Sequence, residues 1–417
     1  MTRTPEHVHT DAAGAGPGAS ASVFAGVDTH ADTHHAAVVD ALGHPLADRQ
    51  FPSTPEGHQD LYDFITSHGR PALVAVEGTG SYGRTLTSHL LFQGLQVREA
   101  LRPGTPKRPR GKTDTIDAYR AARAAAADDG SLPVPKTGTG SVTAIRAAKN
   151  ARRQAVRAQG DTMRQLKDLL ITAPTSVRED YRGLDDRALL DALAALDQPD
   201  PQQDPGQIVR SVLGCLARRW LDLDTEINQH TRLLDTLTLQ ANPALRATKG
   251  VGTVVAAELL SLAGDNPGRI RSQAALAAMT GTCPIPASSG RTDRHRLNRG
   301  GDRQANWAIH QIAHNRATHD PTTRAYIQRL ISRGKTKREA IRCLKRAITR
   351  EIYKTLTNPQ PLPDHTTLRQ RRKTKNITLT QAATALHTWP ARISELERGK
   401  RPDRDLTTTY DQWLATA

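Results

Sequence analysis

Four carboxylates in the first third of the chain stand where a fold could bring them together. Asp28 ends the apolar run SVFAGVD, and Glu77 ends the apolar run in VAVEGTGSYG. Asp114 and Asp117 lie three residues apart in KTDTIDAYRAAR, on one face of a helix start. Four carboxylates can hold two Mg²⁺ ions about 3.5–4 Å apart for phosphoryl transfer. The acids therefore predict a divalent-metal site.

Each acid also has an ordinary structural interpretation, because an Asp at a strand end is often a turn residue or a helix cap. Asp114 is the acid that could simply cap its helix. No His/Cys cluster with metal-ligand spacing competes in this region, which favours hard oxygen-ligated cations. We expect metal binding by Asp28, Glu77 and Asp117 first, and by Asp114 next.

The elements that must position these acids can be predicted between residues 22 and 127. Three short strands are followed by the helix STPEGHQDLYDFITSHG, the buried strand ALVAVEGTG, a second helix, the strand LQVREAL and a third helix that carries Asp114 and Asp117. This order is that of a ribonuclease-H-like α/β sheet. Functional groups of open α/β sheets collect at the carboxyl ends of strands, where Asp28 and Glu77 are predicted to lie.

The rest of the chain is predicted to be mostly helical. Two long amphipathic helices with basic flanks, separated by DQPDPQQDPGQ, favour a coiled-coil arm or, equally, a simple packed pair. A KGVG turn resembles a helix-hairpin-helix, whose backbone amides bind phosphate. The predicted domains are a disordered leader (1–20), a catalytic α/β domain (21–130), a helical arm (140–242), a C-terminal domain (243–357), a basic linker (358–375) and a helix-turn-helix (376–417).

A Gly-, Pro- and Arg-rich loop precedes a helix that is predicted from Arg303 to Asn315. Ser288 and Ser289 lie in this loop, where Ser-Ser-Gly taken by itself indicates only a flexible turn. Basic side chains that could contact a nucleic-acid backbone crowd around the two serines, namely Arg291, Arg294, Arg296 and Arg299.

The segment LTQAATALHTWPARISELERGKRP predicts two short helices joined by a tight turn, similar to the helix-turn-helix of phage repressors. Pro390 would take the first position of the second helix, and Gly399 would close it. In a complex with DNA, Pro390, Ala391, Arg392 and Ser394 would face the major groove.

Composition favours a polyanionic partner, because the 417 residues carry a formal net charge of +16. The three scattered cysteines form neither a disulfide framework nor a zinc spacing, which is typical of a reducing cytosol. No apolar run reaches the roughly 18–20 residues of a membrane span. We therefore expect a soluble cytoplasmic protein that binds nucleic acid and no membrane.

Taken together, several motifs resemble the DEDD transposases of the insertion-sequence-110 (IS110) family. They are GVDTHADTH, VEGTGSYG, KTDTIDA, KGVGTVVAAELL and the SSG-x₈-RGGDR segment, spread from Ser22 to about Thr355. The resemblance implies a RuvC-like N-terminal domain that binds Mg²⁺. It also implies that the serine immediately before a glycine, Ser289, is the nucleophile on DNA, with Ser288 as the alternative.

The resemblance further implies the partners of the protein. These are DNA at the element ends and at the target, a structured guide RNA, and further copies of the chain in a dimer or tetramer. Two other functions fit the residues. A junction-resolving nuclease would use the acids and water without the serine, and a DNA-binding regulator would use only the helix-turn-helix.

Overall fold

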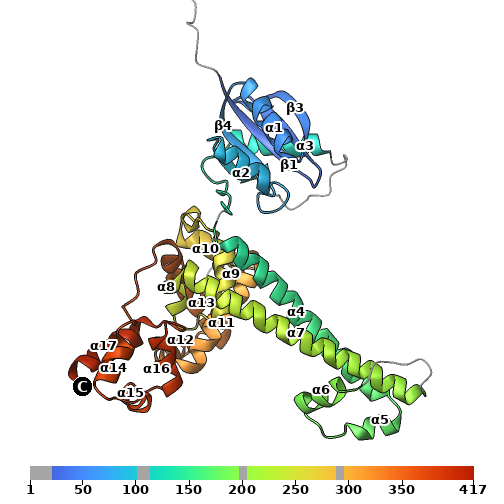
Figure 1. Cartoon of the computed structure of the whole chain (residues 1–417). Coiled ribbons are helices and arrows are strands. Elements are labelled where there is room, and N and C mark those ends of the chain that lie inside the picture. The colour runs from blue at the N-terminus through green and yellow to red at the C-terminus, as the bar shows by residue number, and fades with distance from the viewer. Residues whose placement is uncertain (1–20, 101–112, 139, 197–203, 288–294) are drawn as a thin grey trace, which may run out of the picture. The chain divides into compact units, whose positions relative to one another are not determined.

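The computed structural model of the chain describes residues 21–100, 113–138, 140–196, 204–287 and 295–417. The chain divides into two compact units between Lys136 and Thr137. Figure 1 shows a mixed α/β sheet in the first unit and helices throughout most of the second. Among the described residues, no helix is long and apolar enough to cross a membrane.

The first unit is built on a five-stranded sheet of order β3-β2-β1-β4-β5. The central strand β1 pairs antiparallel with β2 and parallel with β4, which in turn pairs parallel with β5. The three predicted strands at the start of this unit pair antiparallel with one another. The strands are β1 (Ser22–Thr29), β2 (Thr33–Val39), β3 (Pro45–Pro52), β4 (Arg70–Glu77) and β5 (Val97–Ala100).

Three helices complete this unit: α1 (Pro55–Ser67), α2 (Arg84–Phe92) and α3 (Asp114–Ala126). Helix α1 begins within the predicted helical segment, where Thr54 is the N-cap and its hydroxyl accepts a hydrogen bond from the Gly57 amide. The order of strands and helices is the one predicted from the sequence, and it is compatible with a ribonuclease-H-like domain.

Strand alternation divides the unit into two layers around the sheet. Val23, Ala25 and Val27 of β1 are buried in one core together with Leu61 of α1 and Leu86 of α2. The intervening positions of β1 face α3. At Gly26, an added Cβ would lie 2.0 Å from the backbone nitrogen of Ala122, so only glycine lets α3 approach the strand this closely.

In the second unit, two long helices pack along each other, and two short helices follow the first of them. Arg152 donates a hydrogen bond to Thr231, and Gln159 donates one to Asp224, which gives an antiparallel pairing. The helices are α4 (Val142–Thr172), α5 (Thr175–Asp180), α6 (Asp186–Ala194) and α7 (Pro205–Ala241).

The sequence analysis predicted the two long helices but not α5 and α6. These short helices form because they bury an apolar face: Val177 of α5 and Leu189, Leu190 and Leu193 of α6 join Leu213 of α7 in a small core. The Asp185 carboxylate caps α6 by accepting from the amides of Arg187 and Ala188.

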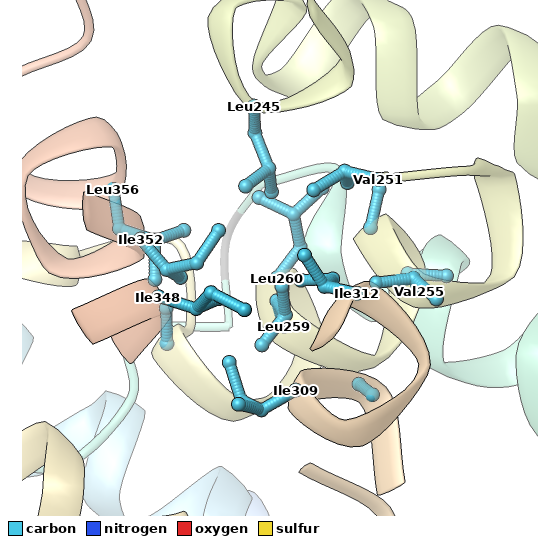
Figure 2. Packing of buried hydrophobic residues seen from close by; sticks show 14 of the residues in the cluster. Leu245, Val251, Val255, Leu259, Leu260, Ile309, Ile312, Ile348, Ile352 and Leu356 are labelled. Carbon is cyan, nitrogen blue, oxygen red and sulfur yellow. The ribbon is translucent and has the colours of Figure 1, made fainter. Parts of the chain in front are cut away.

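A larger helical core lies beyond these helices in the chain. Leu259 and Leu260 pack with Ile309, Ile312 and Ile348 (Figure 2). Its elements are α8 (Pro243–Ala247), α9 (Thr253–Ala263), a 3-10 turn (Pro267–Arg269), α10 (Gln273–Met279), the paired strands β6 (Ile285–Pro286) and β7 (His295–Arg296), α11 (Arg303–His319), α12 (Pro321–Ser332) and α13 (Lys337–Thr357).

Four short helices close the chain: α14 (Leu368–Thr374), α15 (Leu379–Ala385), α16 (Pro390–Glu397) and α17 (Arg404–Thr416). We call residues 368–417 the C-terminal module, because they share their own core, which includes Leu368, Ile393 and Tyr410. Its first helix lies inside the segment 358–375 that was predicted as a linker. That prediction was wrong for α14, because Leu368 is fully buried.

Candidate metal centre

Strand alternation places the first two predicted acids on the face of the sheet that α3 covers. Asp28 follows Gly26 by two residues on β1, and Glu77 follows the α3-facing Ala75 by two on β4. The hydroxyl of Thr29 donates to the Glu77 carbonyl oxygen at 2.8 Å and joins the two strand ends. The side chains of Asp28 and Glu77 are 3% and 9% exposed.

Helix α3 supplies the other two acids. Thr113, not Asp114, is the N-cap, so Asp114 is the first helical residue, and it is about half exposed. Asp117, one turn further on, is buried. The helix start is anchored by Tyr119, whose hydroxyl donates to Asp48 at 3.0 Å, in addition to the close approach at Gly26.

His30 completes a group of possible metal ligands. Its Nε2 lies 3.3 Å from Asp28 Oδ2 and 3.3 Å from Asp114 Oδ1. One ligand atom from each of these three residues lies within 4.8 Å of the others. Within the described chain, the buried Asp28 Oδ2 has no hydrogen-bond partner. An unsatisfied buried carboxylate oxygen beside a carboxylate and an imidazole fits a divalent cation.

Arg120 pairs with the other two acids. Its Nη1 lies 2.7 Å from Asp117 Oδ1, and its Nη2 lies 3.7 Å from Glu77 Oε2. One set of four carboxylates was expected from the sequence. The structure gathers them at one sheet edge in two subsets, with His30 between Asp28 and Asp114 and Arg120 between Asp117 and Glu77.

Electrostatics at this edge disfavour a full complement of negative charge. Burial raises the pKa of the Asp28 carboxyl, and the Glu77, Asp117 and Asp114 carboxylates raise it further, while His30 lowers it. A bound cation would stabilise the ionised form of every one of these acids. The arrangement is therefore suited to hold a cation and to place it against an anionic substrate.

His30 and Arg120 were missed by the sequence analysis. Both could have been found from spacing alone. His30 follows Asp28 by two residues and so continues the same face of the strand, and Arg120 follows Asp117 by three residues on one helix face. The group that the structure adds contains one histidine beside two carboxylates and no cysteine.

Comparison with known families matches both halves of the chain. Residues 25–173 match the family model of DEDD transposases of the IS110 type, and residues 242–328 match the transposase model of the IS116/IS110/IS902 family. The chain belongs to the IS110 family of transposases. The first match contains all four acids of the sheet edge, and the second contains the SSG and RGGDR motifs.

A curated relative of this transposase is the insertion element IS900 uncharacterized 42 kDa protein of Mycobacterium paratuberculosis. The two sequences are 29% identical over 161 residues, which is 37% of this chain and 40% of that protein. The matched part therefore spans less than half the length of either chain. Residues 368–417 lie beyond both family models.

The predicted serine loop of the transposase falls mostly outside the described residues. Ser288, Ser289, Arg291 and Arg294 belong to that part of the chain. On either side of it in sequence, β6 pairs with β7, Pro286 opposite His295. Arg296 on β7 and Arg299 just after it are both exposed, which leaves them accessible to a polyanion.

One predicted DNA contact in the C-terminal module was wrong. Arg392 is buried, and it donates hydrogen bonds to the Arg401 carbonyl oxygen and to Asp403 Oδ2 at 2.6 and 2.8 Å. It holds the turn after α16 and cannot face a groove at the same time. Pro390 does take the first helical position, and Ser394 is half-buried.

Proposed function

We propose that this transposase cuts and rejoins DNA at the ends of an insertion element and at its target, with a Mg²⁺ site at the sheet edge of a RuvC-like domain. Asp28, Glu77, Asp114 and Asp117 would hold the metal. The observation that carries the proposal is the buried Asp28 Oδ2, which has no hydrogen-bond partner in the described chain and lies beside His30 and Asp114.

Each residue at this edge has a distinct part in the proposal. Bound Mg²⁺ would stabilise the charge that develops on the reacting phosphate. Asp28 and Asp114 would provide the ligand oxygens that point at one position, and His30 would orient both. Arg120 fixes the carboxylates of Asp117 and Glu77, so that a small movement of its side chain would release them as further ligands.

Ser289 is the proposed nucleophile, and Ser288 is the alternative. Its Oγ would attack the phosphorus as the bond to one sugar oxygen breaks, the serine proton leaving to a base and the sugar oxygen taking up a proton. The product is a phosphoserine link to DNA. Attack on that link by a second sugar hydroxyl reverses the step and joins new strands. The exposed Arg296 and Arg299 would stabilise the pentacoordinate phosphate.

Further parts of the proposal concern partners. The acids and Ser289 belong to different units of the chain, so a homo-oligomer could supply them from different copies. The antiparallel pair α4 and α7 is the proposed coiled-coil arm of that assembly. A guide RNA would pair with DNA, and the net charge of +16 supports binding of both. The C-terminal module would bind duplex DNA as a helix-turn-helix.

Recombination of a plasmid-borne element tests the metal site. Asp28→Ala should abolish the product, and a wild-type rate in this variant would refute the proposal. Chelation of divalent metal should have the same effect on the wild-type protein. Binding of DNA that chelation leaves unchanged, without strand cleavage under any condition, would instead indicate a regulator.

A second assay tests the serine. Denaturing electrophoresis should trap a covalent protein–DNA adduct that disappears in Ser289→Ala and persists in the matched variant Ser288→Ala. The reverse pattern would assign the nucleophile to Ser288. Free nicked DNA without any adduct would indicate a metal-dependent nuclease that uses water.

A further inference from the structure

The second unit contains a cavity of about 500 Å³ between the β6–β7 pair, α12 and α13. One wall comes from Thr282, Cys283 and Pro284, which precede β6, and from the residues of and after β7 up to Asn298. Tyr326 of α12 and one side of α13 form the rest. A volume of this size falls in the range of about 300–1,000 Å³ that small-molecule sites occupy.

The lining of this cavity is strongly basic. It contains a single carboxylate, Glu339, which is already held by the Thr336 amide and hydroxyl as the cap of α13. Against this one acid stand six cationic side chains: Arg296, Lys335, Arg342, Lys345, Arg346 and Arg350. The cavity therefore suits an anionic ligand.

Three of these cations repeat at four-residue spacing on one face of α13, which the stability of the helix alone would disfavour. Arg342, Arg346 and Arg350 are successive neighbours along that face, and like charges at this spacing repel. Burial, and then the charge of Arg350, lower the pKa of Arg346. Arg342 lies 3.7 Å from Glu339, whereas among the described residues no ion pair joins Arg346 or Arg350 to a carboxylate. Arg346 Nη1 donates to the Gln273 carbonyl oxygen at 3.1 Å, a contact that leaves its charge unneutralised.

The same cavity also presents apolar and aromatic surface. Leu297, Ala347 and Pro284 line it, together with the ring of Tyr326. A phosphate alone would use only the cations, whereas a nucleotide would use both kinds of surface, with its phosphate on arginine and its base on the ring or the aliphatic side chains. A double helix is too wide to enter a cavity of nucleotide size.

We propose that this cavity binds an unpaired nucleotide of a nucleic-acid strand, with the phosphate held by Arg346 and Arg350. The proposal rests on the proposed function in that the strand would belong to the DNA or RNA handled by the transposase. Arg296 connects the cavity with the proposed function, because it lines the cavity and belongs to the strand that follows the serine loop in sequence. The cavity would then hold a strand close in sequence to the proposed nucleophile.

The three cysteines of the chain provide a footprint of this cavity. Cys283 and Cys343 line it, whereas Cys215 lies on α7, and all three are partly exposed. The alkylation rate of each thiol by N-ethylmaleimide can be measured by peptide mass spectrometry on the full chain in EDTA. The probes are a single-stranded DNA and a single-stranded RNA of about ten nucleotides, and the matching duplex.

A single-stranded probe at ten times its Kd should slow alkylation of Cys283 and Cys343 about tenfold and leave Cys215 unchanged. Protection by DNA, by RNA or by both supports the proposal and identifies the strand. Protection by neither, equal protection of Cys215, or protection by the duplex as strong as by single strands would overturn it.

Matched variants separate the cavity from general charge. Arg346→Gln combined with Arg350→Gln should abolish the protection. Arg324→Gln combined with Arg333→Gln removes the same charge from exposed positions outside the cavity and should retain it. Equal behaviour of the two double variants would overturn the proposal. Asp28→Ala should show the wild-type footprint, so that a failed metal site and a failed cavity give different results.

Discussion

The sheet edge of the first unit and the C-terminal module handle buried charge in opposite ways. At the edge, four carboxylates gather with one arginine and one histidine, and Asp28 Oδ2 lacks a hydrogen bond within the described chain. In the module, both carboxylate oxygens of Glu397 are matched: Arg372 donates to them at 2.6 and 3.0 Å, and the Tyr410 hydroxyl donates at 2.8 Å.

This difference separates charge that serves the fold from charge that serves a ligand. A matched buried pair stabilises one arrangement of helices, and loss of one partner leaves the other uncompensated. At the sheet edge, burial and the neighbouring carboxylates disfavour the ionised form of Asp28, and we propose that a bound cation would offset this cost. The cavity beside α13 also gathers like charges for a ligand, but these charges are positive.

The largest expected effect comes from Asp28→Asn. Removal of this ligand should lower strand cleavage by at least about 10³-fold, or roughly 4 kcal/mol in transition-state stabilisation. Without metal, the same change should leave the thermal unfolding temperature unchanged or raise it, because it removes one of several repelling charges. A large fall in that temperature would show that Asp28 stabilises the fold, and it would contradict the difference drawn between the sheet edge and the C-terminal module.

Arg372→Met should have the opposite effect, because it should lower the stability of the fold. It leaves the Glu397 carboxylate buried with only the Tyr410 hydroxyl, and we expect the C-terminal module to lose about 3–5 kcal/mol of unfolding free energy. Hydrogen exchange of peptides from α14 and α17 measures this loss. Arg371→Met, on the exposed side of the same helix, is the matched control and should cost less than about 1 kcal/mol.

Gly26→Ala should disturb the sheet edge without changing its charge. The new methyl group would overlap the backbone of Ala122 and Ala118, so α3 must move away from β1. We expect a loss of about 3 kcal/mol in the first unit, near the upper end for overpacked sites, together with weaker metal binding. Gly268→Ala meets no atom within 4 Å and should be neutral in the same thermal scan.

Lowering the pH should have a smaller effect on stability, through two histidines on the opposite face of the sheet. His34 is fully buried and stacks on His58 at 5.4 Å, and burial followed by the His58 charge lowers its pKa to about 4. The unfolded chain therefore binds a proton that the folded chain excludes. Stability should fall by on the order of 2 kcal/mol as the pH drops from 6.5 toward 4.5.

Hydrogen exchange of β2 and α1 across this pH range measures the effect. His34→Leu should flatten the dependence, although His58, whose pKa burial also lowers, keeps part of it. A pH dependence unchanged in His34→Leu would contradict the assignment.

The sequence predicted the first unit well because its signals are local. The order of strands and helices follows from apolar runs, turns and capping residues, and the acids are found at the ends of such runs. Close packing is not local. Nothing in the residues around Gly26 indicates that α3 would lie against it. From the sequence we could therefore expect Asp117 to lie near Asp28, but not the packing that brings them together.

Charge partners were predicted least well. Arg392 stands where a repressor-like helix would contact DNA, but its partner Asp403 lies beyond the turn and binds it inside the module. The spacing of His30 after Asp28 and of Arg120 after Asp117 is visible in the sequence, but the atoms that they contact are given only by the structure. The basic cavity could not be predicted from the sequence either, because its cations come from β7, from the turn before α13 and from α13 itself.

We propose that the acids of the sheet edge bind a divalent cation. Electron paramagnetic resonance of Mn²⁺ titrated into the full chain with duplex DNA measures this directly. The account predicts bound Mn²⁺ that Mg²⁺ displaces and that Asp28→Asn abolishes, with Arg372→Met unchanged. Bound Mn²⁺ of the same amount and affinity in Asp28→Asn would contradict it.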